Sequence, residues 1–101
     1  MKLISIPRKL NTRLKLLAVE KDMFLQDLTA QLLRRVLKHQ ELLELLEPQE
    51  RLGPHVPKDG IWVPDALSKK LSLLKVEKGM TKQALTTQLL RIGLRLDAGQ
   101  F

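Results

Sequence analysis

The chain has 101 residues, a net charge of +7 and no cysteine. This length suits one domain, and the lack of cysteine excludes disulfides and thiolate metal sites. No apolar run approaches the roughly 18 residues of a membrane span, and the first residues lack a signal-peptide pattern. We therefore expect a cytoplasmic protein without membrane contact. With two histidines, His39 and His55, and no nucleophile–base pattern or glycine-rich phosphate loop, we expect neither an enzyme nor a cofactor.

Charge is distributed unevenly along the sequence. Residues 1–39 carry a net charge of +6 and residues 58–101 carry +4, whereas residues 40–57 carry −3. Two basic segments joined by an acidic one are typical of a protein that binds a polyanion and has a solvated linker. The alternative interpretation is a basic protein that its charge merely keeps soluble.

The sequence contains an internal repeat. Residues 4–38 and 61–95 align without a gap at an offset of 57, and 18 of the 35 positions are identical. A unit of about 40 residues rarely buries enough surface to fold alone, so the two copies should share one core. We assign residues 1–39 to the first repeat, 40–57 to an acidic, helical and proline-rich connector, and 58–101 to the second repeat.

The first predicted element of each copy is a short strand that ends at a proline. Residues 3–6 precede Pro7 and residues 60–63 precede Pro64, and each proline should lie in the first turn of the next helix. Because side chains alternate along a strand, two faces are predicted. The inner face holds Ile4, Ile6, Ile61 and Val63. The outer face holds Met1, Leu3, Ser5, Lys58, Gly60 and Trp62.

Two amphipathic helices follow each strand. The predicted core positions of the first helices are Leu10, Leu14, Leu17, Ala18, Leu67, Leu71 and Leu74. Those of the second helices are Leu28, Leu32, Leu33, Val36, Leu37, Leu85, Leu89, Leu90 and Leu94. Between the helices the chain turns at Asp22 or Gly79, and glycine is the residue better suited to a positive φ. Thr81 is a good N-cap for the next helix, whereas the first copy has Phe24 at that position.

The connector should contain a short helix and then a stiff, extended approach to the second strand. Leucines and glutamates fill residues 41–47, Pro48 ends the helix, and Gly53, Pro54 and Pro57 follow. A lone strand leaves its backbone groups unpaired, and a lone helix hairpin leaves an apolar face in water. We therefore expect the two strands to pair antiparallel above one core built from the four helices of the repeats.

This order of elements resembles the ribbon-helix-helix superfamily, which includes the Arc and methionine repressors. The most specific motifs are the Ile-x-Ile/Val-Pro strand end and the turn at residues 77–81. Each occurs in both copies at the same offset, which makes the resemblance more specific. The resemblance covers both repeats but not the connector. It implies a mainly α fold with a two-stranded antiparallel β-ribbon. The family normally forms this fold as a homodimer, so tandem repeats imply an intramolecular pseudodimer.

The resemblance further implies a sequence-specific transcriptional regulator, a repressor, that binds double-stranded DNA with the ribbon in the major groove. The base-reading residues would be Leu3, Ser5, Lys58 and Trp62. The phosphate contacts would be Lys21, Lys78, Thr81 and Lys82. In the first copy Phe24 and Asp27 suit a phosphate poorly, because an acidic side chain repels it. The two halves therefore differ on this face, which suggests an asymmetric DNA site.

The residues leave other functions open. An outer face with Leu3, Gly60 and Trp62 is unusually apolar for base reading and also suits a protein partner that contacts Trp62. An antitoxin-type regulator is a third interpretation, although such proteins usually add a C-terminal segment, and only residues 97–101 follow the last predicted helix. Members of the family often bind adjacent half-sites cooperatively, so self-association of pseudodimers on DNA is also expected.

Overall fold

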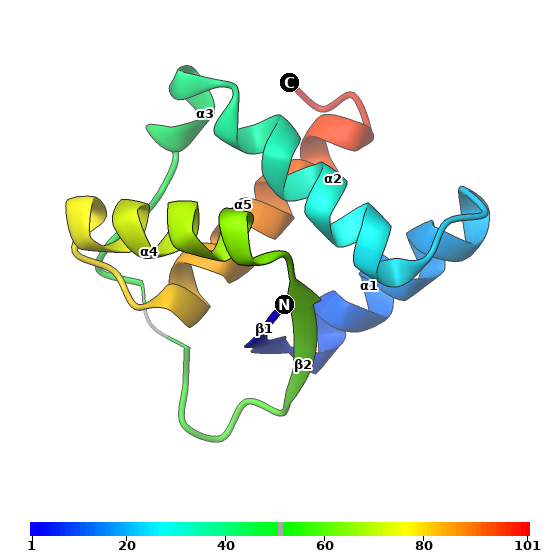
Figure 1. Cartoon of the computed structure of the whole chain (residues 1–101), viewed down its shortest axis with the longest axis horizontal. Coiled ribbons are helices and arrows are strands. Elements are labelled where there is room, and N and C mark those ends of the chain that lie inside the picture. The colour runs from blue at the N-terminus through cyan, green and yellow to red at the C-terminus, as the bar shows by residue number, and fades with distance from the viewer. Residues whose placement is uncertain (51) are drawn as a thin grey trace.

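A computed structural model describes residues 1–50 and 52–101 of the chain. It is mainly helical and contains one two-stranded antiparallel sheet, as predicted, in an arrangement compatible with a ribbon-helix-helix-like fold (Figure 1). The elements in chain order are β1 (Lys2–Pro7), α1 (Arg8–Glu20), α2 (Leu25–Leu37), α3 (Gln40–Leu43), β2 (Lys58–Val63), α4 (Asp65–Lys78) and α5 (Lys82–Asp97). None of the helices in the described part of the chain has the length and apolar character needed to cross a membrane.

The register of the ribbon is centred on one pair of isoleucines. Ile4 of β1 pairs with Ile61 of β2, and these two residues are equivalent in the repeat alignment. Because the strands are antiparallel and each isoleucine lies opposite its own counterpart, a two-fold rotation about this pair exchanges the strands. On the outer face, Leu3 lies opposite Trp62.

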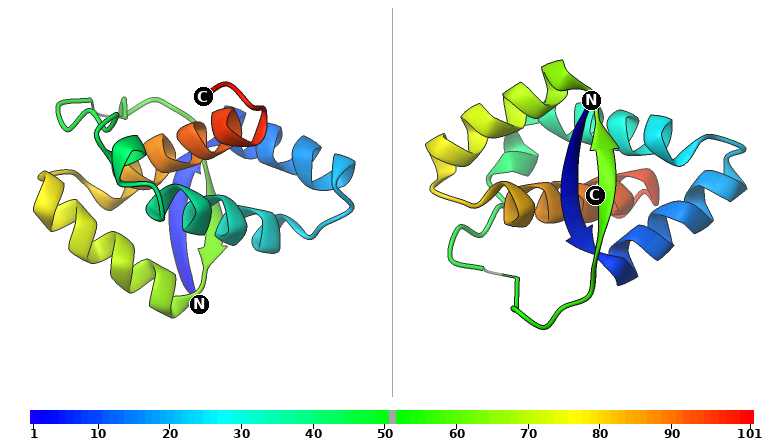
Figure 2. Two further views of the ribbon diagram at one scale, coloured as in Figure 1. Left: turned by 90° about the horizontal axis from the view of Figure 1, so that it is seen from above. Right: turned by 60° about the horizontal axis from the view of Figure 1, so that its bottom comes forward.

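The two faces of the ribbon have different surroundings, as strand alternation predicts. The helices all lie on one side of the ribbon, and the other side is open (Figure 2). The inward side chains are buried in the core, namely Ile4, Ile6, Ile61 and Val63. Burying each of these side chains contributes roughly 1.5–3 kcal/mol, so the inner face fixes which side of the ribbon faces solvent.

A single hydrophobic core lies beneath the ribbon and receives side chains from both strands and all five helices. The predicted core positions are buried, except that Leu17 and Leu37 are only partly buried. Helix α2 packs against α5, α1 against α2, and α4 against α5. The sharing of one core by both repeats agrees with the expectation that neither repeat buries enough surface alone.

Helices α2 and α5 approach closely at Gly93. A Cβ atom at Gly93 would lie 3.1 Å from Leu32 Cβ and 3.4 Å from Val36 Cγ2. Val36 and Gly93 are equivalent positions of the two repeats. The larger residue of one repeat therefore fills the space that the glycine of the other leaves open.

The turns between paired helices are closely similar in the two repeats. Asp22 has a φ of 55° and Gly79 a φ of 67°, so both adopt the left-handed conformation. The N–H of the next residue, Met23 or Met80, donates to the carbonyl oxygen five residues earlier, at 2.9 Å in both copies. This is the hydrogen bond that characterises a Schellman helix end. The predicted turns at Asp22 and Gly79 are confirmed.

The two prolines lie one position earlier than predicted. Pro7 and Pro64 are the N-caps of α1 and α4, with ψ angles of 138° and 144°, rather than residues of the first helical turn. At Pro7 the reason is the ribbon itself, because Pro7 still pairs with Lys58 and so keeps an extended backbone, whereas Pro64 directly follows the last residue of β2. Their missing N–H groups cost little at an N-cap, since no intrahelical bond requires them.

The connector packs against α5. Its helix α3 is a short, separate element with Leu42 and Leu43 buried, and Leu46 of the following turn is buried as well. The Glu47 N–H donates to Gln88 Oε1 at 2.8 Å, and Gln88 Nε2 donates to the Glu47 carbonyl at 3.0 Å. The side chains of Glu41, Glu44 and Glu47 are exposed, as predicted for an acidic solvated face.

Candidate nucleic-acid interface

An apolar patch occupies one end of the open ribbon face. Leu3 and Trp62 lie opposite each other and expose 58% and 51% of their surface. The Leu3 side chain also covers the backbone at Gly60. About half of each residue is open to solvent, so both side chains are available to a partner.

Ser5 and Lys58 supply the polar part of the same face. Both are half-buried, and they lie opposite Gly60 and Pro7, respectively. Strand alternation places them on the same side as Leu3 and Trp62. The structure therefore brings the four predicted base-reading residues together, two from each strand, with the apolar pair toward one end and Lys58 toward the other.

The N-terminus of α5 lies beside this ribbon in the second repeat. Thr81 is its N-cap, as predicted, and Thr81 Oγ1 accepts a hydrogen bond from the Ala84 N–H at 3.1 Å. The hydroxyl is thus engaged in capping, while the other N–H groups of the first turn and the positive end of the helix dipole remain available to an anion. A phosphate contact here would use the backbone rather than the Thr81 side chain.

Three lysines act together at this helix end. The Lys82 ammonium donates to Ser68 Oγ at 2.6 Å. Partial burial lowers the pKa of Lys82 below its usual value, and the nearby positive charges of Lys75 and Lys2 lower it further. Asp65 lies near enough to Lys2 for that lysine to lower its pKa, so Lys2 is partly balanced, whereas Lys75 and Lys82 repel each other and would be stabilised by an anion. Lys2 and Lys75 were not among the predicted phosphate contacts, although the second copy has Lys75 where the first has Ala18.

The equivalent region of the first repeat has the opposite character. The residue aligned with Lys2 is Asp59, and its carboxylate pairs with Arg8 Nε at 3.2 Å. Asn11 Nδ2 also donates to Asp59 Oδ2 at 3.1 Å. The Asn11 and Arg8 hydrogen bonds lower the pKa of Asp59. The N-cap of α2 is Phe24, which makes no side-chain capping bond, and Asp27 lies in the first turn.

Lys21 and Lys78, the remaining predicted phosphate contacts, lie in different parts of the structure. Lys21 Nζ lies 3.0 Å from Asp97 Oδ1, and Arg35 Nη1 lies 3.4 Å from the same oxygen. This ion pair is at the C-terminal end of α5, roughly 24 Å along the helix from Thr81. Lys78 ends α4 and forms no ion pair within the described residues. The structure therefore groups Lys78, Thr81 and Lys82, and separates Lys21 from them.

The described residues hold no group of three or more histidine or carboxylate side chains placed to bind a metal ion. The candidate interface consists of the outer ribbon face together with the N-terminus of α5 and its three lysines, Lys2, Lys75 and Lys82. No protein-family model, curated protein or solved structure matches this chain.

Proposed function

We propose that this chain is a single-chain ribbon-helix-helix pseudodimer that binds double-stranded DNA in a sequence-specific manner and acts as a transcriptional repressor. The observation that carries the proposal is the ribbon, whose outer face is open and presents side chains from both strands. A two-stranded ribbon is narrow enough to enter the major groove, where base edges can be distinguished.

The pseudodimer is supported because residues that are equivalent in the sequence repeat take equivalent places in the structure. Ile4 and Ile61 are equivalent in the alignment and paired in the ribbon, which is the register that a symmetric dimer would have. The turns at Asp22 and Gly79 have the same conformation and the same closing hydrogen bond. The repeats thus correspond in sequence, in element order and in local geometry.

Binding to DNA is supported by charge and its placement. The net charge of +7 favours a polyanion, and the positive charges of Lys2, Lys75 and Lys82 act on one another near the N-terminus of α5, where the helix dipole also favours a phosphate. The first repeat lacks this cluster and instead has the Arg8–Asp59 ion pair. One half should therefore hold the DNA backbone more tightly than the other, and the preferred site should not be a palindrome.

A selection of bound duplexes from a random pool tests sequence specificity. We expect a single recovered motif without two-fold symmetry. Affinity should fall steeply with salt, because phosphate contacts release counterions. Recovery of no motif, together with a flat salt dependence, would contradict the proposal.

Matched variants separate base reading from phosphate binding. Trp62→Ala and Ser5→Ala should change the recovered motif, whereas Lys82→Gln should weaken binding to all sequences by about 1 kcal/mol and reduce the salt slope. Lys38→Gln is the control, because it removes the same charge at the C-terminal end of α2, next to the acidic connector. An effect of Lys38→Gln equal to that of Lys82→Gln would show that only net charge matters.

A second candidate function is protein binding through the same ribbon face. The exposed Leu3–Trp62 pair favours it, because apolar side chains of this size are characteristic of protein contacts. Under this alternative, Trp62→Ala would keep the affinity for DNA and its sequence preference but lose a protein partner. A change of DNA motif in Trp62→Ala decides in favour of base reading.

Self-association on DNA is a separate part of the proposal. The outer surfaces of α1 and α4 expose equivalent apolar side chains, namely Leu16 and Val19 in one repeat and Leu73 and Val76 in the other. Copies bound side by side could pack these surfaces together. Sedimentation of the protein on duplexes with one and two sites should show cooperative loading of the longer duplex, and Val19→Asp combined with Val76→Asp should abolish that cooperativity.

A further inference from the structure

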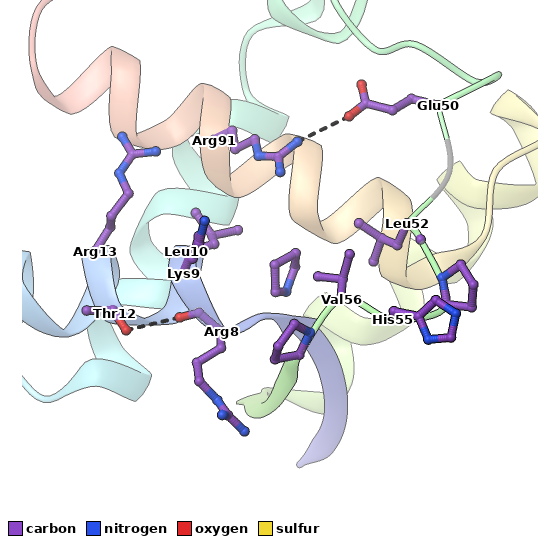
Figure 3. Close-up of a pocket in the computed structure, with 14 residues that line it drawn as sticks. Arg8, Lys9, Leu10, Thr12, Arg13, Glu50, Leu52, His55, Val56 and Arg91 are labelled. Carbon is purple, nitrogen blue, oxygen red and sulfur yellow. Dashed lines mark hydrogen bonds and ion pairs between the residues drawn. The ribbon is translucent and has the colours of Figure 1, made fainter.

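A groove of about 1070 Å³ lies outside the candidate DNA interface, between the connector, the start of α1 and one side of α5 (Figure 3). Its volume is slightly above the range of about 300–1,000 Å³ that is usual for small-molecule sites. The connector is not part of the repeat, so the groove that it lines does not follow from the repeat itself.

The groove combines an apolar lining with a basic rim. Leu10 of α1 is buried at its base, and Leu52 and Val56 of the connector line it from the other side. Lys9 and Arg13 lie on its α1 side and make no ion pair within the described part of the chain, while Arg91 of α5 pairs with Glu50 at 3.2 Å. Cations therefore outnumber carboxylates around an apolar surface.

The combination of apolar and cationic side chains in the groove favours one class of ligand. A phosphate backbone would satisfy the cations but has nothing to cover Leu52 and Val56. A neutral hydrocarbon would cover those side chains but leave the charges of Lys9 and Arg13 unbalanced. We propose that the groove binds a small anionic molecule with an apolar body, such as a carboxylate carrying a hydrocarbon chain or ring, with its anionic group facing Lys9 and Arg13.

The groove is connected to the ribbon through the backbone. The Arg8 N–H donates to the Pro57 carbonyl at 2.8 Å, and both residues line the groove. β2 begins at Lys58, directly after Pro57, and β1 ends at Pro7, directly before Arg8. A bound molecule would contact the chain where β1 ends and where β2 begins. Its binding would therefore bear on the position of both strands.

Calorimetric titration with decanoate tests the proposal, and decyltrimethylammonium serves as a probe with the same chain and the opposite charge. Decanoate should bind at one site and at least about tenfold more tightly than the cation. The measurement contains no DNA, so its outcome is independent of the proposed function. No binding, or equal binding of the two probes, would overturn the proposal.

Three variants locate the site. Val56→Asp places a carboxylate in the groove at an exposed position, so it should leave the fold intact and weaken decanoate binding about tenfold or more. Val19→Asp makes the same change on the outer surface of α1 and should have no effect. Trp62→Ala should also have no effect. Loss of binding in Trp62→Ala with retention in Val56→Asp would place the probe on the ribbon and overturn the proposal.

Discussion

The side chain of Leu3 lies over Gly60, so closely that a Cβ atom at Gly60 would come within 2.7 Å of Leu3 Cδ1. The two residues occupy the same position in the two repeats. The Leu3 side chain can therefore take this position only because residue 60 has no side chain. The contact also fixes the arrangement of the outer ribbon face, because Leu3 lies opposite Trp62.

Gly60→Ala should displace the Leu3 side chain, since no real Cβ approaches another carbon at that distance. We expect a shift in the emission of Trp62, the only tryptophan, and little loss of stability, because the exposed end of the Leu3 side chain can move aside. Fluorescence and urea unfolding measure both effects. Gly53→Ala is the control, because its new Cβ would meet Val56 Cγ2 at an ordinary 3.4 Å. Unchanged emission in Gly60→Ala would contradict the contact.

The two second helices should respond in opposite ways to substitution of their N-caps. Thr81→Ala removes the hydrogen bond to the Ala84 N–H and should cost about 1 kcal/mol. Phe24→Thr should add a similar stabilisation, because Phe24 is 80% exposed, forms no capping bond and has nearly the same backbone angles as Thr81. Urea unfolding of both variants provides the measurement. A destabilised Phe24→Thr would show that the Phe24 ring contributes more than a cap does.

Gly79→Ala should destabilise the protein through the backbone alone. Its φ of 67° is unfavourable for a residue with a Cβ, and, its chain neighbours apart, the described residues place no atom within 4 Å of the position that the Cβ would take. We expect a loss of about 1 kcal/mol on thermal or urea unfolding. Gly79→Asn should lose less, because asparagine tolerates this conformation better, as Asp22 does in the first repeat. Equal losses in the two variants would argue against a conformational cause.

Asp59 should contribute to the acid sensitivity of the fold. Its pKa in the folded protein lies below the ordinary value of 3.8, because Asn11 and Arg8 donate hydrogen bonds to the carboxylate. A lowered pKa means that the stabilisation is present above pH 3.8 and is lost as the pH falls through the folded-state value. Asp59→Asn should therefore lose less stability than the wild type between about pH 5 and about pH 2 in urea titrations. Glu44→Gln, in the exposed connector, should follow the wild type.

Much of the fold could be predicted because the relevant signals are local and occur twice. The periodicity of Leu10 and Leu14 and the turn at Gly79 are constraints that a single helix or turn imposes on its own sequence. The outer position of Trp62 follows from strand alternation once Ile61 is placed inward. The predicted position of Pro7 was wrong by one residue, because its pairing with Lys58 is a tertiary constraint that extends the strand.

The electrostatics of the candidate site and the groove could not be predicted in the same way. The cluster of Lys2, Lys75 and Lys82 joins three separate elements, so its existence depends on how the helices pack beside the ribbon. The engagement of Lys21 by Asp97 likewise joins residues far apart in the sequence. The groove depends on the path of the connector, and a segment with no counterpart in the repeat offers no second copy for comparison.

The contact between Val36 and Gly93 has a consequence for the origin and engineering of the chain. Like Leu3 and Gly60, it places a large residue of the first repeat against a glycine at the equivalent position of the second. Two first repeats paired in this way would bring valine against valine between the helices and leucine against leucine on the ribbon. Two second repeats would leave both places empty. Each repeat therefore packs better against the other than against a second copy of itself. If the gene were split at the connector, the two protein fragments should associate with each other in preference to forming homodimers.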